Sequence, residues 1–417
     1  MNQNKPSFVS TFLSHSKVDK PLVEAVARQL GRRGAVTWFD KNELLELGPL
    51  DVTLKQAVQQ QATLSIFLSE ASVNSAWCTD ELRWAIEAQD GSAHLLPIYL
   101  GEPLRLVKAH ELLRKRFLHA DGDRVNQLGY VCTENPTDSD INAIANKIAA
   151  SAYHRSIKKK WSDVIIYLDQ RGNGLRRGIP ELPENITRLD APILVFRPDL
   201  GSRSPGATLR GTDWSEVVNT MMQSLSFALG TVRGETRSVR VLGSAQTGLM
   251  WAIGKHFDRT TSAALYGYGR EEFAITNRNQ VRHTSLPDGN FNAAVQIGEQ
   301  SVKVGSAHET VALGVGSQNK FGPIVQSAVP GIPLFWIESG LIQDSEQAMS
   351  LVKDIVAVVE RLRREYGTRE LVLFWTTANH VALLAAANIT SHVIPTVKYM
   401  EWDREASEYV HLPMSEV

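Results

Sequence analysis

Short apolar segments alternate with amphipathic helical segments along most of the chain, and this alternation limits the fold more than any other feature. The first apolar segment is residues 8–14, and the helical pattern after it has an apolar face that includes Val23, Val26 and Leu30. Apolar strands that are separated by helices are typical of parallel sheets covered on both faces. We therefore expect an α/β fold built from parallel sheets.

The length predicts more than one domain. A chain of 417 residues is long enough for two or three domains. A run of three lysines at residues 158–160 follows the last helical pattern of the first part. We expect a first domain at residues 1–153, a linker at residues 154–160 and a second domain at residues 161–417.

The charge balance limits the partners. The chain has 44 Lys plus Arg residues against 45 Asp plus Glu residues, a formal net charge of −1. Binding to long DNA or RNA depends on neutralising many phosphates, so we expect no such partner. A small anion needs only a few well-placed donors and fits this composition.

The apolar and cysteine content indicate the compartment. No apolar run reaches the roughly 18 residues that span a bilayer, and the first residues lack a signal-peptide pattern. The two cysteines, Cys78 and Cys132, are too few for a disulfide framework or a four-thiolate zinc site. We expect a cytoplasmic protein with no membrane contact, no metal and no cofactor.

Reactive side chains gather where the first strands end. In open α/β sheets, ligands bind at the carboxyl ends of the strands. A helix dipole favours an ionised carboxylate near the helix start, although such a residue can also serve only as a cap with its aromatic neighbours in the core. The candidate site residues are Ser14, Trp38, Asp40, Trp77 and Glu81.

Three motifs in this part resemble the TIR domain. They are FLSHS at residues 12–16, VTWFD at residues 36–40 with the loop to Gly48, and SAWCTDEL at residues 75–82. The resemblance implies a flavodoxin-like fold. It also implies hydrolysis of NAD at the nicotinamide ribosyl bond, with Glu81 as the catalytic residue.

One carboxylate is sufficient for this reaction. Nicotinamide leaves NAD as a neutral molecule, so it needs no proton from a second acid of the kind that most glycosidases use. Glu81 would accept hydrogen bonds from the ribose and stabilise positive charge in the transition state. Trp38 or Trp77 would wall the pocket, because an aromatic face attracts a pyridinium cation, or would simply belong to the core. NAD is then a substrate and not a cofactor.

Neighbouring residues offer other chemistry. His15 is a candidate acid or base, but a lone histidine on a loop is usually solvated. Cys78 is a candidate nucleophile, but a cysteine beside a core tryptophan is typically a small buried hydrophobe. The loop at residues 41–50 carries two acids and a cluster of Leu44, Leu45 and Leu47, which favours an assembly surface over an ordinary connection.

The second part contains an internal repeat. One copy runs from residue 238 to 268 and the other from 370 to 397, and each has a strand, a run of small polar residues, a helix and a strand. Free backbone N–H groups at a helix start bind anions. The repeat predicts two Rossmann-like halves whose helix starts face one ligand with several phosphates.

This repeat, on a chain that begins with TIR motifs, resembles the SAVED domain, a fusion of two CARF-like halves, over residues 161–417. The resemblance implies binding of a cyclic oligoadenylate, with cyclic tri-adenylate as the first candidate, in CBASS anti-phage defence. It further implies ligand-induced self-assembly into an oligomer or filament that depletes NAD. The candidate ligand-binding residues are Arg197, Ser244, Gln246, Thr247, Tyr268, Arg270, Thr376, Thr377, Asn379 and Trp402, with His380 and Lys398 as further candidates.

Two other functions stay open from the sequence. The TIR domain would be a non-catalytic scaffold in a signalling protein that a cyclic nucleotide gates, or the carboxy-terminal part would itself degrade the ligand as a ring nuclease. The sequence also leaves open the ring size and bases of the ligand, the geometry of the oligomer, and whether the product is linear or cyclic ADP-ribose.

Overall fold

The computed structural model describes residues 7–38, 63–87, 95–126, 129–133, 135–157, 163–170, 180, 182–189, 191–198, 209–231, 238–260, 264–267, 294–297, 309–389, 394–403 and 406–413. Its strands are β1 (Ser7–Phe8), β2 (Ser10–Ser14), β3 (Val36–Trp38), β4 (Thr63–Leu68), β5 (Leu95–Leu100), β6 (Tyr130–Cys132), β7 (Asp163–Asp169), β8 (Pro192–Phe196), β9 (Ser238–Ser244), β10 (Ala264–Gly267), β11 (Ala294–Ile297), β12 (Thr310–Gly316), β13 (Leu334–Glu338), β14 (Glu370–Trp375), β15 (Thr396–Asp403) and β16 (Glu408–Leu412). Its helices are α1 (Lys20–Gly31), α3 (Glu70–Val73), α4 (Ala76–Glu87), α5 (Pro103–Ala109), α6 (Glu111–Phe117), α7 (Asp138–Ser156), α8 (Glu184–Thr187), α9 (Gly211–Thr231), α10 (Thr247–Thr260), α12 (Gln318–Ala328), α13 (Ser345–Tyr366) and α14 (Asn379–Asn388). Within these ranges no helix combines the length and the apolar character needed to cross a membrane.

The chain divides into two compact units whose residues are not consecutive. The first unit comprises Met1–Trp161, Gly172–Pro205 and Ser224–Gly234, and the second comprises Ser162–Arg171, Gly206–Gln223 and Glu235–Val417. Two segments from the predicted second domain, 172–205 and 224–234, therefore group with the first unit. The division of the chain at residues 153 and 161 stays a prediction.

The first unit contains a parallel sheet in the order β3-β2-β4-β5-β6. This is the flavodoxin-like order, in which the chain moves outward from a central strand first to one side and then to the other. The change of direction lies between the neighbouring strands β2 and β4. Their carboxyl ends border the crevice in which such folds bind ligands. The expected flavodoxin-like fold is confirmed.

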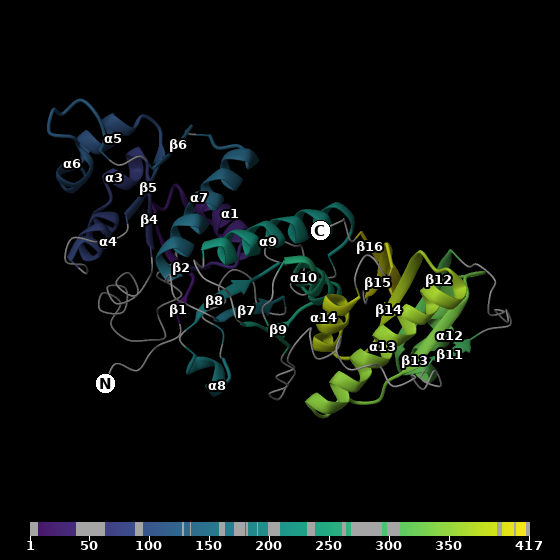
Figure 1. Ribbon diagram of the computed structural model, residues 1–417. Helices are drawn as coiled ribbons and strands as arrows, with labels where there is room; N and C mark the ends of the chain where they lie inside the picture. The colour runs from purple at the N-terminus through teal and green to yellow at the C-terminus, as the bar shows by residue number, and fades with distance from the viewer. Residues whose placement is uncertain are drawn as a thin grey trace. The chain divides into compact units, whose positions relative to one another are not determined.

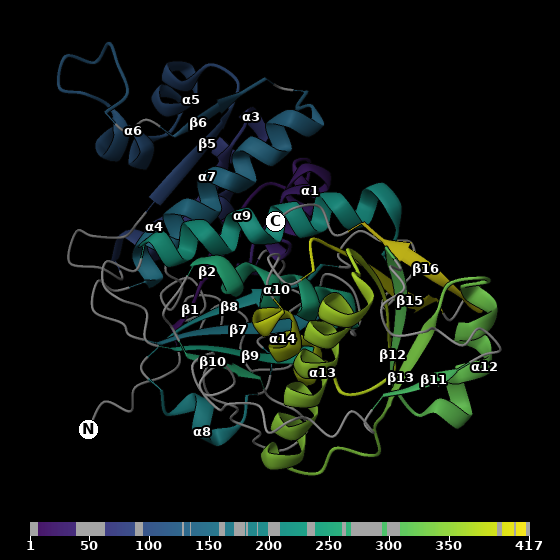
Figure 2. The ribbon, with the colours of Figure 1, turned by 45° about the vertical axis from the view of Figure 1, so that its right-hand side comes forward.

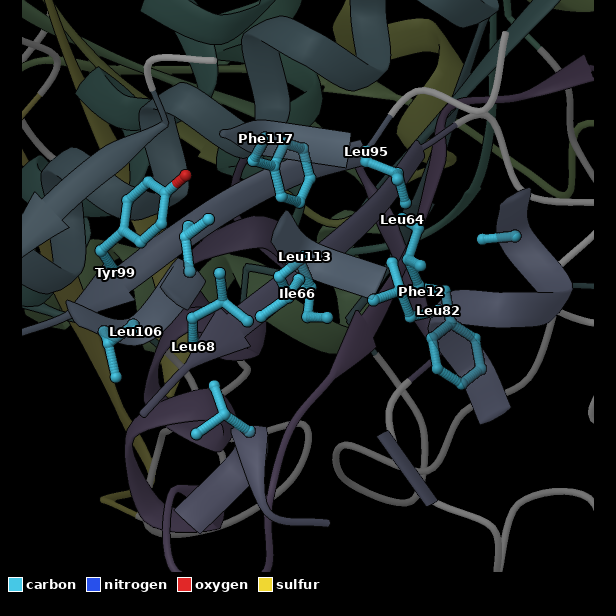
Figure 3. Packing of buried hydrophobic residues seen from close by; sticks show 13 residues of the cluster. Phe12, Leu64, Ile66, Leu68, Leu82, Leu95, Tyr99, Leu106, Leu113 and Phe117 are labelled. Atoms are coloured by element: carbon cyan, nitrogen blue, oxygen red, sulfur yellow. The ribbon is translucent and has the colours of Figure 1, made fainter. Parts of the chain in front are cut away.

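Every residue of β2, β4 and β5 is buried, as the apolar runs predict for strands covered on both faces. Figure 3 shows one side of this core, where Phe12, Ile66 and Tyr99 of the sheet meet Leu82 of α4 and Phe117 of α6. Helices α1 and α7 lie side by side in both ribbon views, and α7 packs on the sheet (Figures 1 and 2). The sheet and its helices thus hold the carboxyl ends of the strands in fixed positions.

Strand β8 joins the first unit through contacts that are distant in sequence. It pairs in parallel with β1, and the backbone N–H of Val195 donates to the carbonyl of Gly34 at 2.9 Å. Gly34 has a φ of +76°, and a Cβ there would lie 2.9 Å from the Phe196 ring. The turn after α1 therefore requires glycine in order to meet β8.

The second unit contains both copies of the internal repeat. In the first copy β9 pairs in parallel with β10 and with β7. In the second copy β14 pairs in parallel with β15. The second copy belongs to a sheet in the order β11-β13-β12-β14-β15-β16, in which the edge strands β11 and β16 are antiparallel to their neighbours. The two predicted strand-helix-strand units are confirmed.

Helices α10 and α14, one from each copy, lie side by side (Figures 1 and 2). Residues 380–388 of α14 are all buried, which accounts for its nearly all-apolar sequence. A Cβ at Gly254 of α10 would lie 2.1 Å from the carbonyl oxygen of Leu383 and 2.8 Å from the Cβ of Ala386. Small residues at this crossing allow the two helices to approach closely.

Candidate functional site

The carboxyl ends of β2 and β4 meet the first half of α4 at the point where the strand order reverses. Ser14, the last residue of β2, is fully buried, and Glu81 of α4 is only 4% exposed. Cys78 lies one helical turn before Glu81 and is also buried. The sheet and the helix therefore bring Ser14 and Glu81 together, as the sequence predicts.

Burial dominates the electrostatics of Glu81. It raises the pKa of this carboxyl from 4.5 to about 7, whereas the Ser14 hydroxyl and the Trp77 indole act in the opposite direction with smaller effect. The Oε2 of Glu81 is buried and has no hydrogen-bond partner among the described residues. Buried polar atoms without partners are uncommon in folded proteins. Glu81 can therefore accept a hydrogen bond from a bound ligand.

The protonation of Glu81 differs from the sequence-based expectation. The helix dipole was expected to keep this carboxylate ionised. Glu81 lies more than one turn after the start of α4 at Ala76, and the dipole acts mainly within the first turn. Burial therefore outweighs it, and the group is divided between its protonated and ionised forms near neutral pH.

The tryptophans take different positions around the site. Trp77 lies close enough to Glu81 to affect its pKa, and it also packs edge-to-face on Trp84 with ring centroids 6.4 Å apart. Trp38 ends β3 and packs, half-buried, on the core of the first unit. The structure therefore places Trp77 at Glu81, and both tryptophans pack on the core of the first unit. That either one walls a substrate pocket stays a prediction. Asp40 and the loop at residues 41–50 lie outside the described residues.

The structure also describes Cys78 and His15, the two other candidate reactive residues of this part of the chain. Burial is the main cause that raises the pKa of the Cys78 thiol to about 11, and the nearby carboxylates of Glu81 and Asp19 act in the same direction with smaller effect. A thiol with this pKa stays protonated at neutral pH and is a poor nucleophile. The ring Nδ1 of His15 is hydrogen-bonded to the carbonyl oxygen of Leu13 at 2.9 Å. Cys78 thus fits the small buried hydrophobe predicted as its alternative.

The second candidate site lies in the second unit, where the two repeats are joined at the starts of α10 and α14. The Thr247 hydroxyl donates to Oδ1 of Asn379 at 2.7 Å. The Nδ2 of Asn379 donates to the carbonyl oxygen of Ala245 at 2.8 Å. Two of the residues predicted to bind the ligand are therefore brought together, and each repeat supplies one of them.

The backbone N–H groups at the start of α10 are already hydrogen-bonded to side chains of this chain. The backbone N–H of Gly248 donates to Oε2 of Glu401 at 3.0 Å. The backbone N–H of Gln246 donates to Oε1 of Gln170, and Gln170 Nε2 donates to Gln246 Oε1 at 2.7 Å. An internal carboxylate thus lies where an anion would bind.

The start of α14 lies at the carboxyl ends of three neighbouring strands. The Thr376 hydroxyl, after β14, donates to the carbonyl oxygen of Val315 in β12 at 3.1 Å. The Thr377 hydroxyl lies 3.0 Å from that of Ser339, which follows β13. His380, in the first turn, is buried, and burial lowers its pKa to about 4. These polar side chains lie together at the carboxyl ends of β12, β13 and β14.

The remaining predicted ligand residues are spread more widely. Arg197 is buried in the first unit, where its backbone N–H donates to the carbonyl oxygen of Gly31 at 2.8 Å, and its part in ligand binding stays a prediction. Ser244 ends β9, and Trp402 packs edge-to-face on Tyr409 with ring centroids 5.1 Å apart. Lys398 forms an ion pair with Glu370 at 2.8 Å. Tyr268 and Arg270 lie outside the described residues.

Sequence reasoning missed Glu401 and Gln170. Glu401 lies on the same face of β15 as Tyr399 and Asp403, and both of these neighbours are buried. A carboxylate on the buried face of a strand is an available signal, because such a group requires a partner. Gln170 follows β7 directly, and the residues around it in the sequence do not indicate that its side chain is buried and hydrogen-bonded. In the described ranges no group of three His, Cys, Asp or Glu side chains is placed to hold a metal ion.

Comparison with known families identifies the part of the chain that contains the first candidate site. Residues 11–128 match the TIR domain family. The amino-terminal part is a TIR domain. The matched segment contains Ser14, Trp77 and Glu81, so the candidate site lies within the TIR domain and the predicted resemblance is confirmed. No curated protein matches the chain.

Solved structures of Cap4 receptors are distantly similar to this TIR protein. The Acinetobacter baumannii Cap4 SAVED/CARF-domain containing receptor with the cyclic trinucleotide 3′3′3′-cAAA gives a TM-score of 0.44 at 12% identity, over 84% of this chain and 80% of that chain. The same receptor with 2′3′3′-cAAA gives 0.43 at 13% identity, over 81% and 85%. The Moraxella osloensis Cap4 receptor gives 0.41 at 12% identity, over 90% and 78%.

Proposed function

We propose that this protein is a NAD hydrolase whose TIR domain cleaves the nicotinamide ribosyl bond and whose second unit controls that activity by binding a cyclic oligonucleotide. The observation that carries the proposal is the burial of Glu81 together with its position at the TIR sheet. It is a single buried carboxylate with a pKa of about 7, it lies at the switch point of the TIR sheet, and its Oε2 has no partner among the described residues.

The chemistry follows from the unpaired Oε2 of Glu81. Glu81 accepts hydrogen bonds from the ribose hydroxyls of NAD, and the Ser14 hydroxyl favours the ionised form of this carboxylate. The bond between ribose C1′ and the nicotinamide nitrogen breaks, and its electron pair leaves with the neutral nicotinamide. Ionised Glu81 stabilises the positive charge that develops on the ribose, an effect that is strongest where water is excluded.

Water then completes the reaction. It adds to C1′ and loses a proton, which the Glu81 carboxylate accepts. A carboxyl with a pKa of about 7 is suited to this role at neutral pH, because both its forms are populated. Before the reaction, the pyridinium cation of NAD favours the ionised form of Glu81 by charge attraction. The Trp77 ring forms a wall of the pocket and attracts the same cation.

The second unit is proposed to bind a cyclic oligoadenylate at the joined repeats. The hydroxyls of Thr376 and Thr377 and the amide of Asn379 offer polar groups at one sheet edge. The Glu401 carboxylate at α10 repels phosphate until it moves away from Gly248. Depletion of NAD on ligand binding serves anti-phage defence in this proposal.

Control by ligand requires two states of assembly. A ligand shifts an equilibrium only if it binds one state more tightly than the other. We propose that the ligand binds the self-assembled oligomer or filament more tightly, and that the assembled TIR domains hydrolyse NAD. This arrangement keeps the enzyme inactive in the absence of the ligand.

The catalytic step is tested by replacing Glu81. Glu81→Gln keeps the shape and removes the charge, so nicotinamide release from NAD is expected to fall at least about a hundredfold. Glu111→Gln makes the same change at an exposed carboxylate that pairs with Lys115, and it should retain full activity. Equal activity of Glu81→Gln and the unchanged protein would contradict catalysis by Glu81 and support a non-catalytic TIR scaffold.

A further inference from the structure

Asp19 is the residue before α1, a position at which an aspartate side chain commonly caps a helix. In the structure its side chain makes no cap hydrogen bond. Its Oδ2 instead accepts hydrogen bonds from the Ser16 hydroxyl at 2.6 Å and the Ser69 hydroxyl at 2.7 Å. Ser16 follows β2 and Ser69 follows β4, so one carboxylate oxygen ties together the ends of two neighbouring parallel strands.

The Ser69 hydroxyl is held in place from its other side. It accepts a hydrogen bond from the backbone N–H of Ser72 at 3.1 Å, and the Ser72 hydroxyl accepts one from the backbone N–H of Ser69 at 2.8 Å. The proton of Ser69 is therefore directed at Asp19. Short hydroxyl–carboxylate bonds of this kind are charge-assisted and stronger than bonds between neutral groups.

This tie lies beside the Glu81 site. Ser16 is two residues after Ser14, and the Ser14 hydroxyl acts on the Glu81 carboxyl. The Cys78 thiol lies within electrostatic reach of both Glu81 and Asp19. The hydrogen bonds of Asp19 to Ser16 and Ser69 connect it to the site through the loop that carries Ser14.

We propose that Asp19 is a positioning residue of the Glu81 site. By holding the loop after β2 against the turn after β4, its carboxylate keeps the Ser14 hydroxyl directed at Glu81. The role in catalysis rests on the proposed NAD hydrolysis, whereas the effect on Glu81 does not. Because Asp19 does not touch the substrate, its loss should change kcat and leave KM nearly unchanged.

Three variants separate the elements of this proposal. Asp19→Ala removes the tie. Asp19→Asn retains an oxygen that can accept both hydroxyls but removes the charge. Ser16→Ala combined with Ser69→Ala removes the two donors and leaves Asp19 in place. Asp140→Ala is the matched control, because Asp140 accepts similar bonds from Thr137 at the start of α7.

The experiment measures the pKa of Glu81 directly, by NMR titration of the full chain with labelled glutamate carboxyls and with Glu81→Gln as the assignment standard. The pKa should rise above that of the unchanged protein in Asp19→Ala and in the double serine variant, because the Ser14 hydroxyl no longer favours the ionised form. It should rise less in Asp19→Asn and stay unchanged in Asp140→Ala.

Kinetics provide the second readout. In Asp19→Ala, kcat should fall roughly tenfold to a hundredfold, the size expected when a reacting group is misplaced, with KM within about a factor of two. An unchanged Glu81 titration in both Asp19→Ala and the double serine variant would overturn the proposal, as would a change confined to KM. If the unchanged protein released no nicotinamide, the proposed function would fail, and the titration would still decide the role of Asp19.

Discussion

At the scale of single residues, Glu81 is an ionisable side chain in an environment that disfavours its charge. The carboxyl is almost completely buried, and in the described structure no donor reaches its Oε2. A group in this state opposes folding once it ionises. Active sites commonly hold such residues, because the same burial that destabilises the free protein strengthens interactions with a bound substrate.

The pH dependence of stability follows from the shift in the pKa of Glu81. The pKa is 4.5 in the unfolded chain and about 7 in the folded one, so the folded state keeps a proton that the unfolded state loses between these values. Stability therefore falls as pH rises through this window, by up to about 3 kcal/mol above pH 7. Glu81→Gln should stabilise the protein at pH 8, and this gain should shrink as pH falls toward 4.5.

Urea denaturation at several pH values measures this effect. The control is Glu111→Gln, which removes an exposed carboxylate that pairs with Lys115 and should give no gain at pH 8. A Glu81→Gln protein that is less stable than the unchanged protein at pH 8 would contradict the description of Glu81 as a buried, unpaired carboxylate.

Cys78 gives a second prediction at this scale. Its thiol has a pKa of about 11 and stays protonated at neutral pH. Cys78→Ala should therefore keep nicotinamide release within a few-fold of the unchanged protein, while the smaller side chain lowers the free energy of unfolding by roughly 1 kcal/mol. Loss of activity comparable to that of Glu81→Gln would show that the thiol takes part in the reaction.

At the scale of elements, apolar periodicity was sufficient to predict β2 and the two strand-helix-strand repeats. These elements follow from local sequence patterns. The grouping of β8 with the first unit was not predictable in the same way, because its pairing with β1 joins segments far apart in the chain. The bond between Glu401 and α10 was missed for the same reason, since its partner Gly248 lies in the other repeat.

The crossing of α10 and α14 gives a prediction at the element scale. Gly254→Ala should lower the free energy of unfolding by about 1–3 kcal/mol, because its Cβ would meet the Leu383 carbonyl oxygen at 2.1 Å. Gly230→Ala is the control, as it lies in α9 with nothing within 4 Å of an added Cβ. Thermal denaturation of both variants tests the crossing, and equal melting temperatures would contradict it.

The carboxylate of Glu401 gives a prediction about the proposed ligand. Glu401→Gln should tighten binding of cyclic tri-adenylate by about tenfold, because it removes the negative charge at the start of α10. Calorimetric titration measures the change, and Glu408→Gln, at an exposed position of β16, should leave affinity unaltered. Weaker binding by the Glu401 variant would show that the carboxylate helps to hold the ligand.

At the scale of the whole molecule, one chain carries a TIR domain with a buried glutamate and a second unit with two joined repeats. The sequence motifs were sufficient to predict the TIR domain and to select Glu81 as a candidate, because each motif lies within a short segment of the chain. The details of the second site depend on contacts between residues that are distant in sequence, such as Thr247 and Asn379, and local patterns do not reveal them.

The most direct test of the account is nicotinamide release from NAD by the purified full chain, with and without cyclic tri-adenylate in its 3′3′3′ and 2′3′3′ forms, while light scattering follows particle size. We expect low release without ligand, and a joint rise of release and particle size when the activating ligand is added. Full release by small, ligand-free particles would contradict the proposed control. No release with either ligand would contradict the proposal that these cyclic tri-adenylates activate a NAD hydrolase.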